Sequence, residues 1–152
     1  MNGAPLHILL VEDNLDHAEL VRRNLVQSQV ANEMHHVEDG ELALDYVFGR
    51  GQFTDRAEFP RPDLVLLDLR LPRVDGLEVL RQIKSDPEWH RLPVVVLTTS
   101  QAERDVAAAY EFHANSFLTK PVDFQTFLQL LKDLGFYWPA GNQPPGPADQ
   151  TI

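Results

Sequence analysis

Residues 64–68 read Leu-Val-Leu-Leu-Asp, an apolar run that ends in a carboxylate. A short continuous apolar run is typical of a strand that is buried on both faces, as the strands of a parallel sheet are. A carboxylate at the end of such a strand is costly to remove from water unless a cation or a hydrogen-bond donor compensates it. Asp68 is therefore the first candidate functional residue of the chain.

Three other strand-like runs also end in polar side chains. They are residues 8–11 before Glu12 and Asp13, residues 94–97 before Thr98, and residues 116–119 before Lys120. The carboxyl ends of parallel strands meet at one edge of the sheet, where open α/β sheets bind their ligands. Each residue alone could be a helix cap or a solvated loop charge, but their shared position at strand ends favours a common site.

Segments with helical periodicity alternate with these strands. The sequence predicts strands at 6–11, 33–37, 64–68, 94–98 and 116–119, and helices at 15–28, 41–48, 75–86, 100–113 and 123–134. This alternation predicts an α/β fold, a doubly wound five-stranded parallel sheet with five helices on its two faces and right-handed crossovers. The segment 49–62 is long for a loop in such a domain, so it is either an insertion with a role or a mobile segment.

Composition narrows the class of protein. The chain has 152 residues, a net charge of −10 and no cysteine. This length suits one domain, the negative charge argues against nucleic acid as a partner, and the lack of cysteine excludes disulfides and thiolate chemistry. No segment resembles a signal peptide or reaches the roughly 20 apolar residues of a membrane span, so we expect a cytoplasmic protein without membrane contact.

The composition changes near the C-terminus. From residue 139 onward the chain is rich in Pro, Gly, Gln and Asp, and residues 144–147 read Pro-Pro-Gly-Pro. Such a segment lacks the apolar surface that would repay the entropy of ordering it. We therefore expect residues 1–138 to form the domain and residues 139–152 to form a Pro/Gly-rich disordered tail.

The expected cluster has a definite chemistry. Three neighbouring carboxylates, Glu12, Asp13 and Asp68, would repel one another unless a cation compensates them. A hard divalent ion such as Mg²⁺ takes oxygen ligands of this kind together with phosphate oxygens. Asp68 could then act as a nucleophile toward a phosphoryl group, with Lys120 as the cation and Thr98 as a hydroxyl donor.

Four segments carry a resemblance to a known family. They are residues 10–14 (Leu-Val-Glu-Asp-Asn), 66–72 (Leu-Leu-Asp-Leu-Arg-Leu-Pro) with Asp75-Gly76, 97–100 (Leu-Thr-Thr-Ser), and 117–121 (Phe-Leu-Thr-Lys-Pro). In order and spacing they resemble the signature segments of bacterial response-regulator receiver domains. The resemblance covers residues 6–134 and implies a flavodoxin-like sheet with strand order 2-1-3-4-5.

The resemblance also implies a role for each site residue. Asp68 would accept a phosphoryl group from a sensor histidine kinase. Glu12, Asp13 and Asp68, with the backbone carbonyl of Arg70, would hold Mg²⁺. Lys120 and Thr98 would contact the phosphoryl group, Phe117 would be the switch aromatic, and the Lys120–Pro121 peptide bond would be cis.

A narrower resemblance concerns a subgroup of stand-alone receivers, some of which pair with bacterial phytochrome kinases. It depends on the long segment 49–62 and on residues 104–111. The chain departs from the family at Thr99, where Ala or Gly is usual and where a larger side chain narrows access to the phosphoryl group. It departs from the subgroup at 139–141, where Pro-Ala-Gly interrupts an apolar tail.

The C-terminal half also suggests an association surface. The fourth helix, fifth strand and fifth helix are expected to share a face, and the end of the domain is aromatic: Tyr110, Phe117, Phe124, Phe127, Leu131, Phe136, Tyr137 and Trp138. Most of these residues are expected in the core, but an aromatic end after the last helix is harder to bury. We therefore predict a homodimer through this face.

The histidines do not indicate a metal site, and two other functions are less well supported than a phosphoacceptor. The six histidines share no metal-ligand spacing, and His35 and His36 point to opposite faces of their strand, so we assign them structural or surface roles. A receiver-like binding module that is not regulated by phosphate remains the alternative function. A small-molecule aspartyl-phosphate hydrolase is disfavoured because Asp68 is followed two residues later by Arg70 rather than by a second acid.

Overall fold

The computed structural model describes residues 5–28, 30–99, 102, 105 and 114–136, and every structural statement below concerns these residues. They contain a five-stranded sheet with the strand order β2-β1-β3-β4-β5, in which every neighbouring pair is parallel. The strands are β1 (Leu6–Val11), β2 (Asn32–Val37), β3 (Leu64–Asp68), β4 (Val94–Thr98) and β5 (Ser116–Thr119). The predicted fold and strand order are confirmed.

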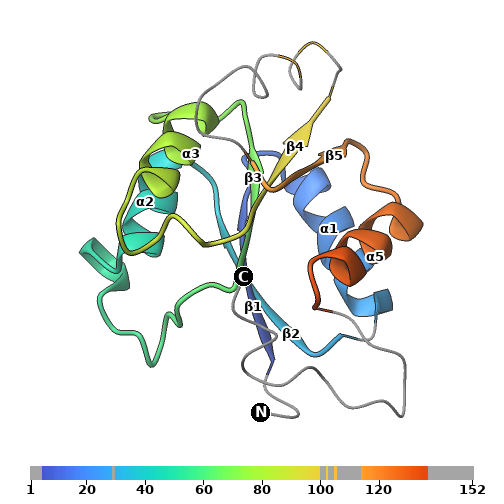
Figure 1. Ribbon diagram of the computed structural model, residues 1–152, viewed down its shortest axis with the longest axis horizontal. Helices are drawn as coiled ribbons and strands as arrows, with labels where there is room; N and C mark the ends of the chain where they lie inside the picture. The colour runs from blue at the N-terminus through green and yellow to red at the C-terminus, as the bar shows by residue number, and fades with distance from the viewer. Residues whose placement is uncertain (1–4, 29, 100–101, 103–104, 106–113, 137–152) are drawn as a thin grey trace.

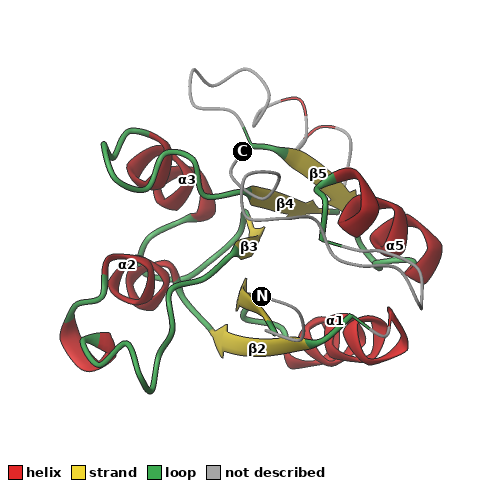
Figure 2. Cartoon of the chain, turned by 60° about the horizontal axis from the view of Figure 1, so that its bottom comes forward, coloured by secondary structure: helices red, strands yellow, loops and turns green. Residues whose placement is uncertain are grey.

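Helices cover both faces of the sheet. They are α1 (Leu15–Ser28), α2 (Gly40–Phe48), α3 (Gly76–Lys84) and α5 (Phe124–Asp133), with a 3₁₀ turn, η1 (Gly51–Phe53), after α2. In Figures 1 and 2 the sheet separates α2 and α3 from α1 and α5. The fifth predicted helix, at 100–113, lies almost entirely outside the described residues.

Two apolar cores lie on opposite faces of the sheet. Leu67 on β3 belongs to the core beneath α2 and α3, whereas its neighbour Leu66 belongs to the core beneath α1 and α5. This division follows from the pleat of a strand, because successive side chains point to opposite faces. Both β3 and β4 are buried along their whole length, as the continuous apolar runs predict.

Short polar side chains fix where the helices begin. Asp39, Asp75 and Asp123 each accept a hydrogen bond from the backbone N–H three residues later, at the start of α2, α3 and α5. Asp75 therefore caps α3 at the position where the sequence predicts a helix to begin. The Glu78 carboxylate, however, accepts hydrogen bonds from Arg81 and Gln82, which lower its pKa to about 2.

The segment 49–62 has an ordered structure centred on Arg56. Its guanidinium donates hydrogen bonds to the carbonyls of Tyr46 (2.8 Å), Val47 (2.7 Å) and Phe59 (3.2 Å). Phe53 is buried against the core beneath α2 and α3, and its ring meets that of Tyr46 at 5.0 Å. Of the two alternatives for this segment, these contacts favour the insertion with a role, here a structural one.

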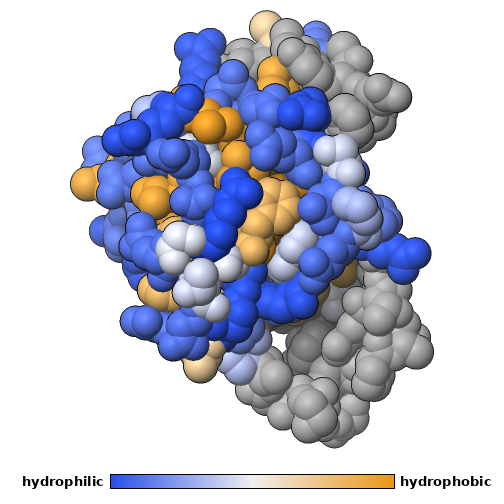
Figure 3. All heavy atoms as spheres, turned by 90° about the vertical axis from the view of Figure 1, so that its left-hand side faces the viewer, coloured by the Kyte–Doolittle hydropathy of each residue, from blue (hydrophilic) through white to orange (hydrophobic). Residues whose placement is uncertain are grey.

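The outer surface is polar over the half of the molecule that carries α2 and α3. Figure 3 shows this face as largely hydrophilic, with hydrophobic atoms in separate patches. Among the described residues, no helix is both long enough and apolar enough to cross a bilayer.

Candidate functional site

The candidate site lies at the carboxyl ends of the strands. Glu12 follows β1, Asp68 is the last residue of β3, Thr98 is the last residue of β4, and Lys120 follows β5. The chain winds outward from β1 in both directions, so the gap between β1 and β3 is the switch point where open α/β sheets bind ligands. The predicted convergence of these strand ends is thus present.

A buried ammonium group lies between two of the carboxylates. Lys120 Nζ is 2.7 Å from Glu12 Oε1 and 3.2 Å from Asp68 Oδ2. Solvent reaches only 6% of the Lys120 side chain and none of the Glu12 side chain. At this depth a charge pair is weakly screened, so removing one partner leaves an uncompensated buried charge.

The third carboxylate gives the cluster an excess of negative charge. One oxygen each from Glu12, Asp13 and Asp68 lies within 4.8 Å of the others, and Asp13 is exposed at the mouth of the site. Lys120 supplies one positive charge against three acids. Burial raises the pKa of Glu12, and the charge of Asp68 adds to this effect, whereas the hydrogen bond from Lys120 opposes it.

This donor set fits a hard divalent cation. Carboxylate oxygens are the ligands that such ions prefer, and an ion at this position would neutralise the excess charge. Arg70 lies beside the cluster, because its backbone N–H donates to Asp68 Oδ1 at 3.3 Å. That contact places the residue whose carbonyl is the expected fourth ligand next to the phosphoacceptor candidate.

Thr98 carries an unsatisfied group. The residue is 1% exposed, and its hydroxyl has no hydrogen-bond partner among the described residues. A buried hydroxyl without a partner costs about 1–3 kcal/mol, so such groups usually serve a ligand or a rearrangement. Its backbone carbonyl accepts from Lys120 N at 2.7 Å, which ties the ends of β4 and β5 together.

Phe117 lies on β5, next to the strand that ends at Thr98. It pairs in register with Val96, two residues before Thr98, and its half-buried side chain packs against the core beneath α2 and α3. The Lys120–Pro121 peptide bond is cis, as the family resemblance implies.

Glycines shape the loop that follows Asp68. A Cβ on Gly76 would lie 2.3 Å from the carbonyl oxygen of Asp68, and a Cβ on Gly40 would lie 1.8 Å from that of Val74. Gly76 N also donates to Leu69 O at 2.9 Å. The residues between β3 and α3 therefore pack closely against the first residues of α2 and α3. A side chain at position 76 would clash with this loop, which explains the glycine after Asp75 in the signature segment.

His17 is a site neighbour that the sequence did not reveal. His17 lies in the first turn of α1, and its Nδ1 is 3.3 Å from Lys120 Nζ and 3.9 Å from Glu12 Oε2. Asn14 positions this turn by accepting a hydrogen bond from His17 N at 3.0 Å. The signal was its place directly after the acidic end of β1, on the turn that must return across the same sheet edge.

The predicted association face is only partly described. Tyr110, Tyr137 and Trp138 lie outside the described residues. Phe127 and Leu131 are buried beneath α1 and α5, and Phe136 packs against the same core. Those three residues therefore contribute to the fold, as most of this set was expected to do.

The sheet order, the acidic strand ends, the bridging lysine and the buried threonine together define a phosphoacceptor domain. Residues 8–132 match the response regulator receiver domain family, and the chain belongs to this family. The sequence-based recognition is confirmed.

Three relatives show where in the family the chain lies. It is 42% identical over 144 residues to the probable methanogenesis regulatory protein FilR2 of Methanothrix harundinacea, covering 95% of this chain and 90% of that one. It is 41% identical over 137 residues to response regulator Rcp1 of Synechocystis sp., covering 90% and 91%. The solved bacteriophytochrome response regulator RtBRR superposes with a TM-score of 0.81 at 42% identity, covering 97% of this chain and 89% of that one.

A metal has been seen in one of these relatives. The Mn²⁺-bound form of Rcp1 superposes with a TM-score of 0.71 at 39% identity, covering 93% of this chain and all of that one. The chain is thus a receiver-type response regulator related to phytochrome response regulators, and its acidic cluster is compatible with a divalent ion.

Proposed function

We propose that this protein is a receiver that accepts a phosphoryl group on Asp68 from a sensor histidine kinase and thereby changes its protein partners. The observation that carries the proposal is the position of Lys120 Nζ, within 3.2 Å of Asp68 and 2.7 Å of Glu12, with Asp13 completing the acidic cluster. This arrangement supplies a nucleophile, a cation and a metal-ligand set in one place.

The transfer itself requires little of the protein beyond positioning. An Asp68 carboxylate oxygen attacks the phosphorus of a phosphohistidine, the new O–P bond forms, and the N–P bond breaks with the electron pair returning to the imidazole. Lys120 stabilises charge on the phosphoryl oxygens, and the unpartnered Thr98 hydroxyl donates to one of them. Mg²⁺, when held by Glu12, Asp13, Asp68 and the Arg70 carbonyl, supplies further neutralisation of that charge.

The chemistry is tested with a small phosphodonor. Incubation of the full chain with Mg²⁺ and acetyl phosphate, followed by intact mass measurement, should give one phosphate adduct. Asp68→Asn should abolish the adduct, whereas Asp133→Asn, an exposed acid on α5, should not. No adduct on the wild-type chain would instead support the phosphate-independent binding module, and continuous turnover of many phosphate esters would support the hydrolase.

The metal assignment has its own test. Asp13→Ala removes one carboxylate of the cluster, so Mg²⁺ binding and phosphorylation should both be lost. Without Mg²⁺ the thermal stability of this variant should hold or rise, because repulsion within the cluster is relieved. Phosphorylation at the wild-type rate would show that the metal is not held here.

Signal transmission is proposed to run from Asp68 through Thr98 to Phe117. A phosphoryl group would draw the Thr98 hydroxyl toward it and open space into which Phe117 rotates, a population shift between two packings. Thr98→Ala should leave phosphorylation possible but remove its effect on partner affinity. If the phosphorylated and unphosphorylated variant still differed in affinity as the wild type does, this route would be excluded.

The proposed partners follow from the family and its relatives. Receivers pair with histidine kinases, and the similarity to the bacteriophytochrome response regulator RtBRR supports a phytochrome-type kinase as the donor here. The donor kinase can be identified by phosphotransfer. Each candidate kinase is radiolabelled with phosphate, and the rate at which the label reaches Asp68 is measured. The cytoplasmic location, the division into a 1–138 domain and a 139–152 disordered tail, and the homodimer remain predictions.

A further inference from the structure

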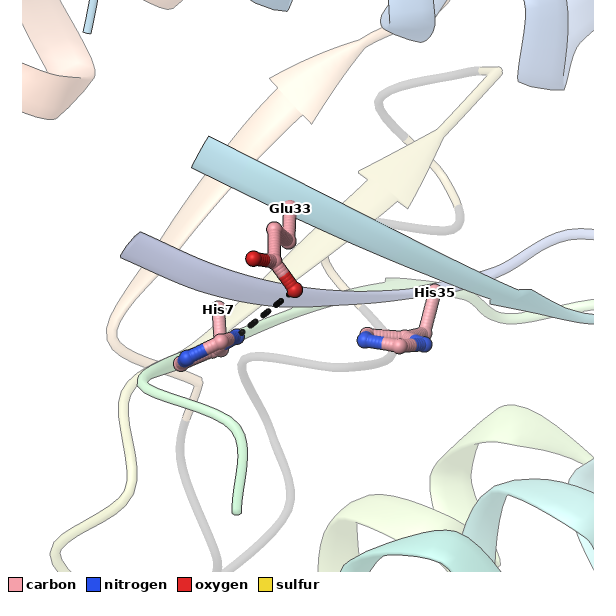
Figure 4. Close-up of side chains that lie close together, drawn as sticks. All are labelled: His7, Glu33 and His35. Atoms are coloured by element: carbon pink, nitrogen blue, oxygen red, sulfur yellow. Dashed lines mark ion pairs between the residues drawn. The ribbon is translucent and has the colours of Figure 1, made fainter. Parts of the chain in front are cut away.

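A second group of potential ligands lies at the opposite end of the sheet. His7 and Glu33 are the second residues of β1 and β2, and His35 is the fourth of the six residues of β2, whereas Asp68 lies at the carboxyl end of β3. His7 pairs in register with Glu33, and His35 follows two residues later, so all three side chains share one face of the sheet. Figure 4 shows Glu33 above the two imidazoles, with both rings turned toward the space below it.

The potential ligand atoms are close together. His7 Nδ1 lies 3.8 Å from Glu33 Oε1, and one atom from each of the three residues lies within 4.8 Å of the others. In a tetrahedral zinc site, with ligand bonds of about 2.0–2.2 Å, neighbouring ligands are about 3.3 Å apart. The Glu33 side chain is 55% exposed, so it can move the remaining distance without disturbing the core.

Both imidazoles have an unsatisfied nitrogen. His7 Nδ1 and His35 Nε2 are buried and have no hydrogen-bond partner among the described residues. An unpartnered buried nitrogen costs about 1–3 kcal/mol, so two in one cluster call for a common explanation. Burial lowers the pKa of His35, which favours the neutral imidazole, the form that binds a metal.

The surrounding structure holds the backbone of His7 and the ring of His35 in place. The backbone of His7 is bonded on both sides to Asp63, from His7 N to Oδ2 at 2.9 Å and from Asp63 N to His7 O at 2.7 Å. The His35 ring packs 5.5 Å from the ring of Tyr46, whose hydroxyl donates to Pro60 O at 3.1 Å. The backbone of His7 and the ring of His35 are thus held in place, and a site that is already partly fixed loses less entropy on binding an ion.

We propose that His7, Glu33 and His35 bind a divalent transition-metal ion of the Zn²⁺ class. Two imidazoles and one carboxylate suit Zn²⁺, whereas Mg²⁺ prefers an all-oxygen set such as the acidic cluster. Three protein ligands leave the fourth position to water. Because the ligands come from two strands, the ion would fasten the edge strand β2 to β1, independently of phosphorylation at Asp68.

The experiment is a Zn²⁺ titration of the full chain against a chromophoric chelator, with excess Mg²⁺ present to occupy the acidic cluster. Wild-type protein should bind one equivalent of Zn²⁺. His7→Gln and Glu33→Gln should each weaken binding by more than about tenfold, since loss of even an outer-shell partner costs that much. His90→Gln, at an exposed histidine whose ring contacts only backbone carbonyls among the described groups, should bind as the wild type does.

A second measurement separates loss of the ligand from loss of the fold. Zn²⁺ should raise the Tm of the wild type and of His90→Gln but not that of Glu33→Gln, whose exposed side chain can change without unfolding the protein. All variants should still take phosphate from acetyl phosphate. Zn²⁺ affinity unchanged in His7→Gln and Glu33→Gln, or no binding by the wild type, would overturn the proposal.

Discussion

Lys120 determines the charge balance of the site when no metal is bound. Its ammonium group contacts both Glu12 and Asp68, and all three side chains are almost completely buried. Breaking a buried ion pair by removing one partner typically costs about 3–5 kcal/mol. The bridge therefore contributes to stability as well as to chemistry.

We accordingly expect Lys120→Ala to lower the free energy of unfolding by about 3–5 kcal/mol in metal-free buffer, and Mg²⁺ to restore part of this loss. Urea denaturation with and without Mg²⁺ measures both effects. Lys132→Ala, at an exposed lysine on α5, is the control and should change stability by less than about 1 kcal/mol. Equal effects of the two substitutions would mean that the bridge does not stabilise the fold.

Glu12 gives the site a distinctive pH dependence. Burial raises its pKa above the ordinary 4.5, so between that value and the folded-state pKa the native protein holds a proton that the unfolded chain has released. In this window the folded state binds more protons, and the contribution of Glu12 to stability falls as pH rises. For most paired carboxylates the folded-state pKa is lowered, and their contribution to stability rises with pH instead.

The test compares Glu12→Gln with the wild type by chemical denaturation from pH 4 to pH 8, without divalent ions. Gln resembles the protonated acid, so the wild type should lose stability relative to the variant as the pH rises above 4.5. The difference should shrink when Mg²⁺ is added, because the ion favours the carboxylate. A difference that is flat with pH, or of opposite sign, would contradict the raised pKa.

Arg56 illustrates how one side chain can order a whole connecting segment. The last carbonyls of α2 have no partner within the helix, and its guanidinium donates to two of them and to Phe59 O. Hydrogen bonds to a charged donor contribute about 1.5–3 kcal/mol each in mutational series, though not additively. The segment 49–62 is therefore expected to depend on this residue.

Replacement of Arg56 by Ala should destabilise the protein by about 2–4 kcal/mol and should speed amide hydrogen exchange in residues 49–62. Arg50→Ala is the matched control, because Arg50 makes an exposed ion pair with Asp45 at 2.8 Å, worth about 0–1 kcal/mol. If Arg56→Ala behaved like Arg50→Ala, the order of this segment would have another origin.

The strands, the helix starts and the strand-end residues were predictable because each depends on local pattern. Apolar runs, caps such as Asp39 and terminal polar residues such as Thr98 are recognised within a few positions of sequence. The position of Arg56, and the meeting of His7 with His35, depend on strand register and on how helices return across the sheet. Such contacts between segments remote in sequence carry no local signal, which is why the histidines were assigned only structural or surface roles.

Taken as a whole, the molecule has two ends with different ligand chemistry. The carboxyl ends of the strands gather carboxylates around Lys120, whereas the opposite end holds His7, Glu33 and His35. The sheet between them is continuously buried along β3 and β4. We therefore expect signals from the phosphoacceptor end to leave the domain through its helical faces, and the predicted association face in the C-terminal half is the candidate surface.

The predicted homodimer can be tested by comparing the full chain with a C-terminally truncated chain. Phe136 packs against the core beneath α1 and α5, and its N–H donates to Leu131 O at 2.8 Å, so the cut must follow it rather than precede it. Light scattering should show the full chain as a dimer and a chain ending at Phe136 as a monomer, if Tyr137 and Trp138 anchor the association. Thermal unfolding of the shortened chain checks that its core is intact. A monomer for both chains, with and without phosphate at high micromolar concentration, would exclude the dimer, and a dimer for both would place the contact on the helical face alone.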